Sequence, residues 1–247
     1  MNIFSPKKIL VLILITLSCY AIYWTAISLI LKSQINSNIN HINGLIYNDI
    51  SISGFPYKIQ TNINDLQIVD FKKGDSLKIP NIKINMNPFD LKNILVRFDK
   101  LRIKISQENM NIKSSIKKVR GLINLDNSSL FSASFLINSG SMTVNNIKVG
   151  EMSQTKFDMI KEKKDMYKFN ALVQSTNLPL IKKKDIKVEL NGKSRINKKN
   201  VNGSFQITAK LNSTDEKIFE FPVNIKNNKA YMFFIPIFDL DKLFRFF

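Results

Sequence analysis

The residues that could carry acid, base, nucleophilic or metal chemistry are few in this 247-residue chain. His41 is the only histidine and Cys19 the only cysteine, so no Ser-His pair and no cluster of His and Cys ligands is expected. The acidic residues stand alone in turns or on strands, for example Asp65, Asp99, Asp126, Asp158 and Asp185. No glycine-rich phosphate loop follows a strand. We therefore expect no catalytic residue, no metal site and no cofactor, and a protein that is not an enzyme.

The elements that would position any site begin with a long apolar run. Residues Ile9–Leu31 carry no charge, and as a helix they reach about 34 Å, enough to cross a hydrocarbon core of about 30 Å. Because the run is longer than the core of a cleaved signal peptide, we interpret it as a transmembrane signal anchor. The isoleucines that follow, at 35, 39, 42 and 46, have helical spacing and predict an amphipathic stalk over residues 32–46 that ends near Gly44.

The charges around this run predict its orientation. Lys7 and Lys8 precede it and Lys32 alone follows directly, so residues 1–8 are expected in the cytoplasm. Residues 47–247 then form a periplasmic domain, and the chain is a single-pass protein of a bacterial inner membrane.

The chain is strongly basic, with 37 Lys and Arg against 19 Asp and Glu. Most lysines fall singly at outward strand positions, whereas a surface that tracks nucleic acid would gather arginine and aromatic residues. We therefore expect no nucleic-acid partner. Contact of the basic surface with anionic lipid headgroups remains an alternative to a charge without a specific partner.

From Ile50 onward, apolar and polar residues alternate with period two in roughly a dozen segments, which predicts half-buried antiparallel strands. Short helices are expected only over residues 88–95, 177–183 and 238–247. The fold class is therefore mainly β, with a large antiparallel sheet whose apolar face needs a cover. That cover is protein if the strands form a sandwich or half-barrel, and lipid if they form one open curved sheet.

The stretch "ISISGFPYKI", residues 50–59, changes the parity of this alternation. Ile50 and Ile52 share one face, whereas Phe55 and Tyr57 have the opposite parity. One extra residue at Gly54 would restore a common face, so we interpret the stretch as one strand with a β-bulge. Gly54, Phe55, Pro56, Tyr57 and Lys58 are thus candidate structural residues and carry no chemistry of their own. Pro80 accompanies a second parity change.

The same motif, placed shortly after the stalk, resembles the uncharacterised bacterial family labelled domain of unknown function 2125, whose hallmark is a Gly-Phe-Pro-Tyr-Arg-like motif. Lys58 stands where that family usually has arginine. Residues 77–105 and the C-terminal "NNKAYMFFIPIFDL" also look like segments of that family. More loosely, one anchor followed by long antiparallel β-structure is similar to AsmA-like envelope proteins, which are implicated in moving or organising lipids.

Taken together, the residues and the resemblance favour a non-enzymatic envelope protein that binds or guides phospholipid or another envelope lipid along an apolar sheet face. The alternative is a structural or adaptor module that binds another envelope protein.

Overall fold

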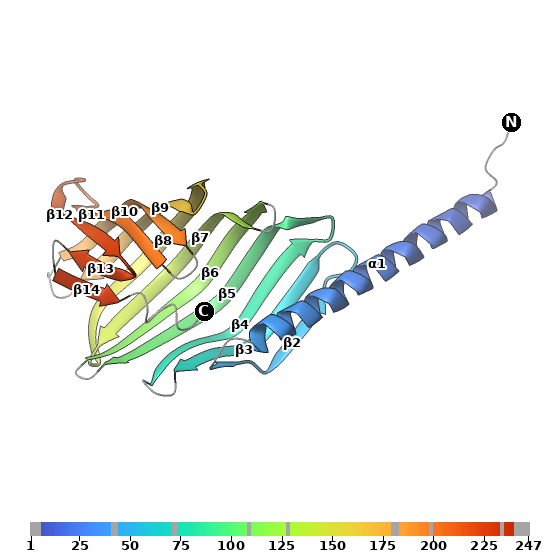
Figure 1. The fold of residues 1–247 in the computed structure, drawn as a ribbon, viewed down its shortest axis with the longest axis horizontal. Helices are drawn as coiled ribbons and strands as arrows, with labels where there is room; N and C mark the ends of the chain where they lie inside the picture. The colour runs from blue at the N-terminus through green and yellow to red at the C-terminus, as the bar shows by residue number, and fades with distance from the viewer. Residues whose placement is uncertain are drawn as a thin grey trace.

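A computed structural model describes residues 6–40, 44–70, 74–107, 110–126, 129–178, 183–197, 200–232 and 235–239. These residues form one helix and an open, curved sheet of 14 strands (Figure 1). The helix is α1 (Pro6–Asn40). The strands are β1 (Leu45–Ile46), β2 (Asp49–Ser53), β3 (Ile59–Asp70), β4 (Asp75–Asn87), β5 (Asp90–Gln107), β6 (Met110–Asp126), β7 (Ser129–Val144), β8 (Ile147–Lys163), β9 (Met166–Leu178), β10 (Lys183–Asn197), β11 (Asn200–Leu211), β12 (Lys217–Lys226), β13 (Lys229–Met232) and β14 (Ile235–Asp239). The expected mainly β fold is confirmed.

The sheet is an antiparallel meander, in which each strand from β3 onward pairs with the next one in sequence. β1 and β2 both pair with β3 and together form one edge, and β14 ends the other. The connections that the structure describes in full are short turns. Asn145 and Asn146, for example, lie at positive φ between β7 and β8, a conformation that asparagine tolerates better than most residues. Among the alternatives left open by the sequence, the structure has the single open curved sheet.

The strands keep their apolar residues on one side although the alternation changes parity in mid-strand. Three residues with positive φ mark the change, at 51° for Asp65 in β3, 52° for Lys118 in β6 and 23° for Gln154 in β8. Each is passed over by the pairing of its hairpin; in β3 and β4, for instance, Asn64 pairs with Asn81 and the next pair is Leu66 with Ile79. These positions form a line across the sheet, which we call the seam. The parity change predicted at Pro80 lies on it, because Pro80 stands opposite Asp65.

The interpretation of residues 50–59 as one bulged strand is wrong. β2 ends at Ser53, β3 begins at Ile59, and the two pair antiparallel from Asp49↔Asn64 to Ser53↔Gln60. Gly54–Lys58 is therefore a hairpin turn, closed by a hydrogen bond from the Lys58 amide to the Gly54 carbonyl of 3.1 Å. The parity changes here because the chain reverses direction, and no extra residue enters a strand.

The predicted short helices are also not observed where the structure describes the chain. Pro88 and Phe89 form a turn, and the rest of residues 88–95 belongs to β5, where Ile94 pairs with Met86. Residues 177 and 178 end β9, residue 183 begins β10 and residues 238–239 end β14; residues 179–182 and 240–247 lie outside the described residues. The stalk is helical as far as Asn40, and Gly44 is a turn residue with φ of +78° just before β1.

α1 continues from the apolar run into the stalk without a break, and its stretch Leu10–Ser37 is long and apolar enough to cross a membrane. By length and composition, a membrane anchor and a signal sequence both fit such a helix. Leu10–Cys19 are exposed on all sides, whereas one side of the helix from Tyr20 to Ile35 is partly or fully covered. Ile35 packs against the core formed by Ile50, Ile63, Ile79 and Ile82, so the second half of α1 lies against the first strands of the sheet. Figure 1 shows the first half projecting beyond it.

Candidate functional site

The most prominent feature of the molecule is a continuous apolar face. Cross-strand partners form rows on it, and two rows cross the sheet from β2 to β12. One row is Ile50, Ile63, Ile82, Phe98, Val119, Ile137, Thr155, Val173, Val188, Ala209 and Phe219. The next is Ile52, Thr61, Ile84, Val96, Gly121, Phe135, Phe157, Ala171, Leu190, Ile207 and Phe221. At about 4.8 Å between neighbouring strands, each row is about 48 Å long.

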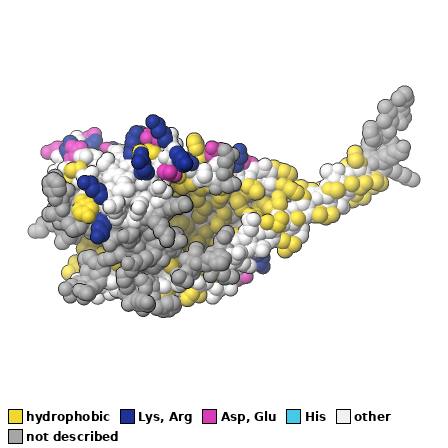
Figure 2. Space-filling view, viewed as in Figure 1, with side chains coloured by type: hydrophobic (Ala, Val, Ile, Leu, Met, Phe, Trp, Pro, Cys, Tyr) yellow, Lys and Arg dark blue, Asp and Glu magenta, His cyan; other side chains and the backbone are white. Residues whose placement is uncertain are grey.

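The opposite face is polar over most of its area. Between the two apolar rows lies a row whose side chains point to the opposite face. It contains Lys83, Arg97 and Arg120 and, farther along, Lys156 and Glu189. Figure 2 shows hydrophobic side chains gathered in the hollow of the sheet and along α1, with charged side chains at its rim. The two faces therefore differ in chemistry, as expected of a sheet with one face in water.

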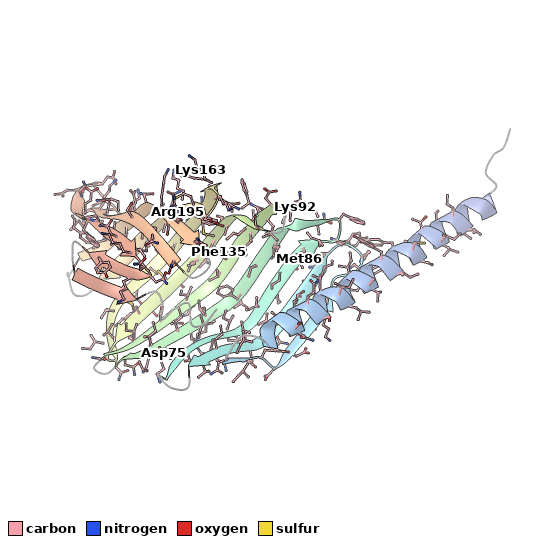
Figure 3. All side chains as sticks on the ribbon, viewed as in Figure 1. Asp75, Met86, Lys92, Phe135, Lys163 and Arg195 are labelled. Carbon is pink, nitrogen blue, oxygen red and sulfur yellow. The ribbon has the colours of Figure 1, made fainter. Side chains whose placement is uncertain are left out.

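Cover on the apolar face is uneven. Around Ile35 of α1 the isoleucines are fully buried, with Ile50 only 3% exposed. Farther along the sheet, no described helix lies over the face, and Phe135, Phe157 and Phe169 remain half-buried. Figure 3 shows Phe135 within the hollow. Smaller residues of the first row, such as Val119, Thr155 and Ala209, are buried between their neighbours. Large apolar surfaces are in general typical of interaction sites.

The aromatic residues on this face form a chain of ring contacts. Centroid distances are 6.4 Å from Phe135 to Phe157, 6.1 Å from Phe157 to Phe169 and 5.7 Å from Phe169 to Phe205. These separations are typical of interacting rings. The chain extends across β7, β8, β9 and β11, passing over β10, so the middle of the hollow is lined by rings.

Glycines make room for these rings. A Cβ on Gly121 would lie 2.4 Å from a Phe135 ring carbon, and a Cβ on Gly192 would lie 2.5 Å from a Phe205 ring carbon. Both glycines are cross-strand partners of the phenylalanines concerned. Each ring therefore lies over the space that a side chain on its partner would occupy.

A cavity of about 270 Å³ lies on the same face at the seam. Its lining includes Gly140, Met142, Gly150, Met152, Val173 and Val188. A Cβ on Gly140 would lie 2.3 Å from the Met152 methyl carbon, so the absence of a side chain there keeps the cavity open. Apolar cavities of this size accept hydrocarbon groups, and methionine side chains adapt to irregular ones.

The ionisable groups with shifted pKa values lie on the polar face of the sheet. Burial raises the pKa of Asp158, but hydrogen bonds from Ser134 at 2.6 Å and Lys156 at 3.0 Å lower it to a greater combined extent. The pKa of Glu189 is lowered by its hydrogen bond with Lys187 at 2.8 Å, with Lys210 contributing at 3.8 Å. Hydrogen bonds and ion pairs of this kind are typical of structural interactions on the surface of a sheet.

Side chains capable of chemistry do not converge in the described part of the chain. No group of three or more His, Cys, Asp or Glu there could hold a metal ion. Cys19 is exposed on the apolar half of α1, and His41 lies outside the described residues. The absence of catalytic residues and cofactors stays a prediction from the sequence.

The residues of the Gly54–Lys58 turn contact α1. The Tyr20 hydroxyl donates a hydrogen bond to the Pro56 carbonyl, and Trp24 Nε1 donates one of 3.2 Å to the Lys58 carbonyl. The Phe55 ring lies 5.7 Å from that of Tyr20 and 5.5 Å from that of Trp24. The sequence marked these residues as structural but did not reveal the contact, because nothing in the local pattern indicates that a turn reaches a helix 30 residues earlier.

Comparisons with family models, with curated proteins and with solved structures find no match to this chain. The resemblance to the domain of unknown function 2125 and to AsmA-like proteins therefore stays a prediction.

Proposed function

We propose that this protein binds or guides lipid chains in the bacterial cell envelope, without catalysing a reaction, and that the lipid lies along the apolar face of the sheet. The observation that carries the proposal is the pair of apolar rows, each about 48 Å long, over most of which no described helix packs. One leaflet of a bilayer has a hydrocarbon layer about 15 Å thick, half of the core, so the face is long enough for several chains end to end.

Lipid fits this face better than a rigid small molecule. The lining offers apolar groups and rings, with Thr155 as the single polar side chain in the first row, so it supplies contact area without directional recognition. Phospholipids and other envelope lipids share this chemistry in their acyl chains. The apolar helix α1 supports this proposal, because a helix anchored in a bilayer would hold the sheet next to a source of such chains.

We further propose that α1 anchors the chain in the inner membrane, with residues 1–8 in the cytoplasm and residues 47–247 in the periplasm. The support is the pair Lys7 and Lys8 before the apolar run. Protease added to spheroplasts should degrade the sheet domain, and a domain left uncut would contradict this orientation.

Photo-cross-linking of the full chain in phospholipid vesicles tests the binding proposal. p-Benzoylphenylalanine replaces Phe135 in one variant and Ser139 in the other. Both positions are in β7, but Ser139 lies on the polar face, where its cross-strand partners are Lys117 and Ser153, and it is partly exposed. We expect a phospholipid adduct from position 135 and only background from position 139.

Equal yields at the two positions, or none at position 135, would contradict lipid binding on the apolar face. A protein that is folded and free of adducts would instead favour the adaptor module that binds another envelope protein.

A further inference from the structure

Two hairpin turns meet α1 at the same level. The β2–β3 turn, Gly54–Lys58, contacts Tyr20 and Trp24 as described above. The β4–β5 turn is at Pro88–Phe89, where the Pro88 carbonyl accepts a hydrogen bond of 3.1 Å from the Tyr23 hydroxyl. The Phe89 ring stacks 5.5 Å from Tyr20 and 6.1 Å from Tyr23. Both turns are thus attached to one turn of the helix.

The two turns contact α1 within its apolar run. A bilayer crossed by this run would therefore not end before the level of the turns. The exposed part of the helix before this contact, Leu10–Cys19, is about 15 Å long at 1.5 Å per residue, whereas the hydrocarbon core is about 30 Å thick. The uncharged run continues to Leu31, and the next charged residue is Lys32. The two turns therefore lie about 12–18 Å to the membrane side of Lys32.

The turns have surfaces suited to lipid. Tyr57 is 88% exposed and Phe89 is 74% exposed, the highest values among the exposed large hydrophobic residues. Backbone polar groups of these turns also have hydrogen-bond partners within the protein. Such partners matter because an unpaired polar group is costly in hydrocarbon. The carbonyls of Pro56, Lys58 and Pro88 accept hydrogen bonds from α1 side chains, and both prolines lack an N–H group. The Phe89 amide donates to the Asn87 side chain at 2.9 Å.

Next to these turns, the polar face of the sheet carries exposed apolar side chains. Leu95 and Leu122 are cross-strand partners on this face and are 42% and 38% exposed. The adjacent row, about 6.6 Å farther from the turns, contains Lys83, Arg97 and Arg120, which are all exposed, and continues with Leu136. The pair on the turn side is Asn93 and Asn124, so the two leucines form an apolar band. The stems of the cations beside this band can lie along acyl chains with their charges at the lipid phosphates.

We propose that the Gly54–Lys58 and Pro88–Phe89 turns are embedded in the leaflet nearest the sheet, as a second membrane contact beside α1. Tyr57 and Phe89 lie among the acyl chains, and Lys83, Arg97 and Arg120 face the lipid phosphates. This contact rests on the proposed membrane anchor α1 but does not require that the apolar face of the sheet carry lipid, so it can fail separately from lipid binding on that face.

Depth-dependent quenching of a fluorescent label tests this proposal. The full chain with Cys19→Ser receives a single cysteine as Tyr57→Cys or Phe89→Cys, each labelled with nitrobenzoxadiazole in vesicles of phosphatidylcholine and phosphatidylglycerol. The control is Lys148→Cys, because Lys148 is exposed and lies on the polar face beside the β7–β8 turn, at the opposite end of the strands, where it pairs with Thr143. Lipids with a spin label on the acyl chain quench from the hydrocarbon, and iodide quenches from water.

We expect the labels at positions 57 and 89 to be quenched by the spin-labelled lipid and protected from iodide, and the label at 148 to behave in the opposite way. Iodide quenching at 57 and 89 as complete as at 148 would overturn the proposal. Protection of only one of the two positions would also overturn it, because both turns contact the same turn of α1. In either case, the cross-linking result at position 135 would stand unaffected.

Discussion

Replacing Gly54 by alanine tests how the β2–β3 turn is built. Gly54 has a φ of +106°, and a Cβ there would lie 2.8 Å from the carbonyl oxygen of Lys58. Such a backbone conformation costs a residue with a side chain about 1–3 kcal/mol. The contact with a backbone oxygen requires a further shift of the turn, so we expect Gly54→Ala to lower the free energy of unfolding by about 2–4 kcal/mol.

A second glycine separates the two contributions. Gly74, in the β3–β4 turn, has a φ of +71°, but the nearest atom to its Cβ would be a Ser106 side-chain atom at 3.8 Å. Gly74→Ala therefore introduces backbone strain without a clash, at a cost of about 1–2 kcal/mol. For a chain of this size, 1 kcal/mol corresponds to roughly 2–4 °C in Tm. We expect Gly54→Ala to lower Tm by about 4 °C or more, and by more than Gly74→Ala does.

The assay is thermal unfolding of the full chain in detergent micelles, followed by circular dichroism of the sheet. Trp24, the only tryptophan, contacts Phe55, so its fluorescence reports on the turn itself. Equal shifts of Tm in the two variants would show that the Lys58 carbonyl does not constrain the turn. An unchanged Tm in Gly54→Ala would contradict both the backbone strain and the contact with the Lys58 carbonyl inferred for this turn.

Three further changes probe other parts of the molecule. Tyr23→Phe leaves the Pro88 carbonyl without its donor, and thermal unfolding in vesicles should show a loss of about 1–3 kcal/mol. Glu189, whose pKa is lowered through Lys187, stabilises the fold above its unfolded pKa of about 4.3 and loses this effect as the pH falls further. Denaturant unfolding at pH 7 and pH 3 should therefore show a smaller loss of stability on acidification in Glu189→Gln than in the unmodified chain. Gly140→Leu fills the cavity at the seam, and lipid cross-linking from position 135 should fall about twofold or more while the circular dichroism spectrum is unchanged.

The strands could be predicted because the period-two pattern is local. Leu101, Ile103 and Ile105 alternate with basic residues in one short segment, and the structure places all three on the apolar face. The parity change at Pro80 was equally visible. Its counterparts at Lys118 and Gln154 show that the change is shared by neighbouring hairpins, a property that depends on register.

The errors arose where the sequence pattern permits two structures. A parity change at a glycine fits a bulge or a reversal of the chain, and only the pairing of Ser53 with Gln60 decides for a hairpin at Gly54. Residues 88–95 have apolar spacing that also suits a helix, but Ile94 finds its partner in Met86, and this pairing overrides the local preference.

The open apolar face was predicted only as one of two alternatives, the other being a sandwich or half-barrel in which protein covers that face. The sequence indicates that the sheet has an apolar face, but whether the strands close into a sandwich depends on twist and on pairing across the whole chain. The roles of Gly121 and Gly192 were also hidden, because a glycine beneath a cross-strand phenylalanine can be recognised only once the register is known.

The simple meander of the sheet has a consequence for how such a protein can evolve. From β4 onward each strand pairs only with its neighbours in sequence, so the contacts resemble those of a repeat protein, and stability is close to a sum of local contributions. Duplication or loss of one hairpin would leave every other pairing intact and change the length of the sheet by about 9.5 Å. The span of the apolar face is therefore a quantity that selection can adjust in steps, without redesign of the rest of the fold.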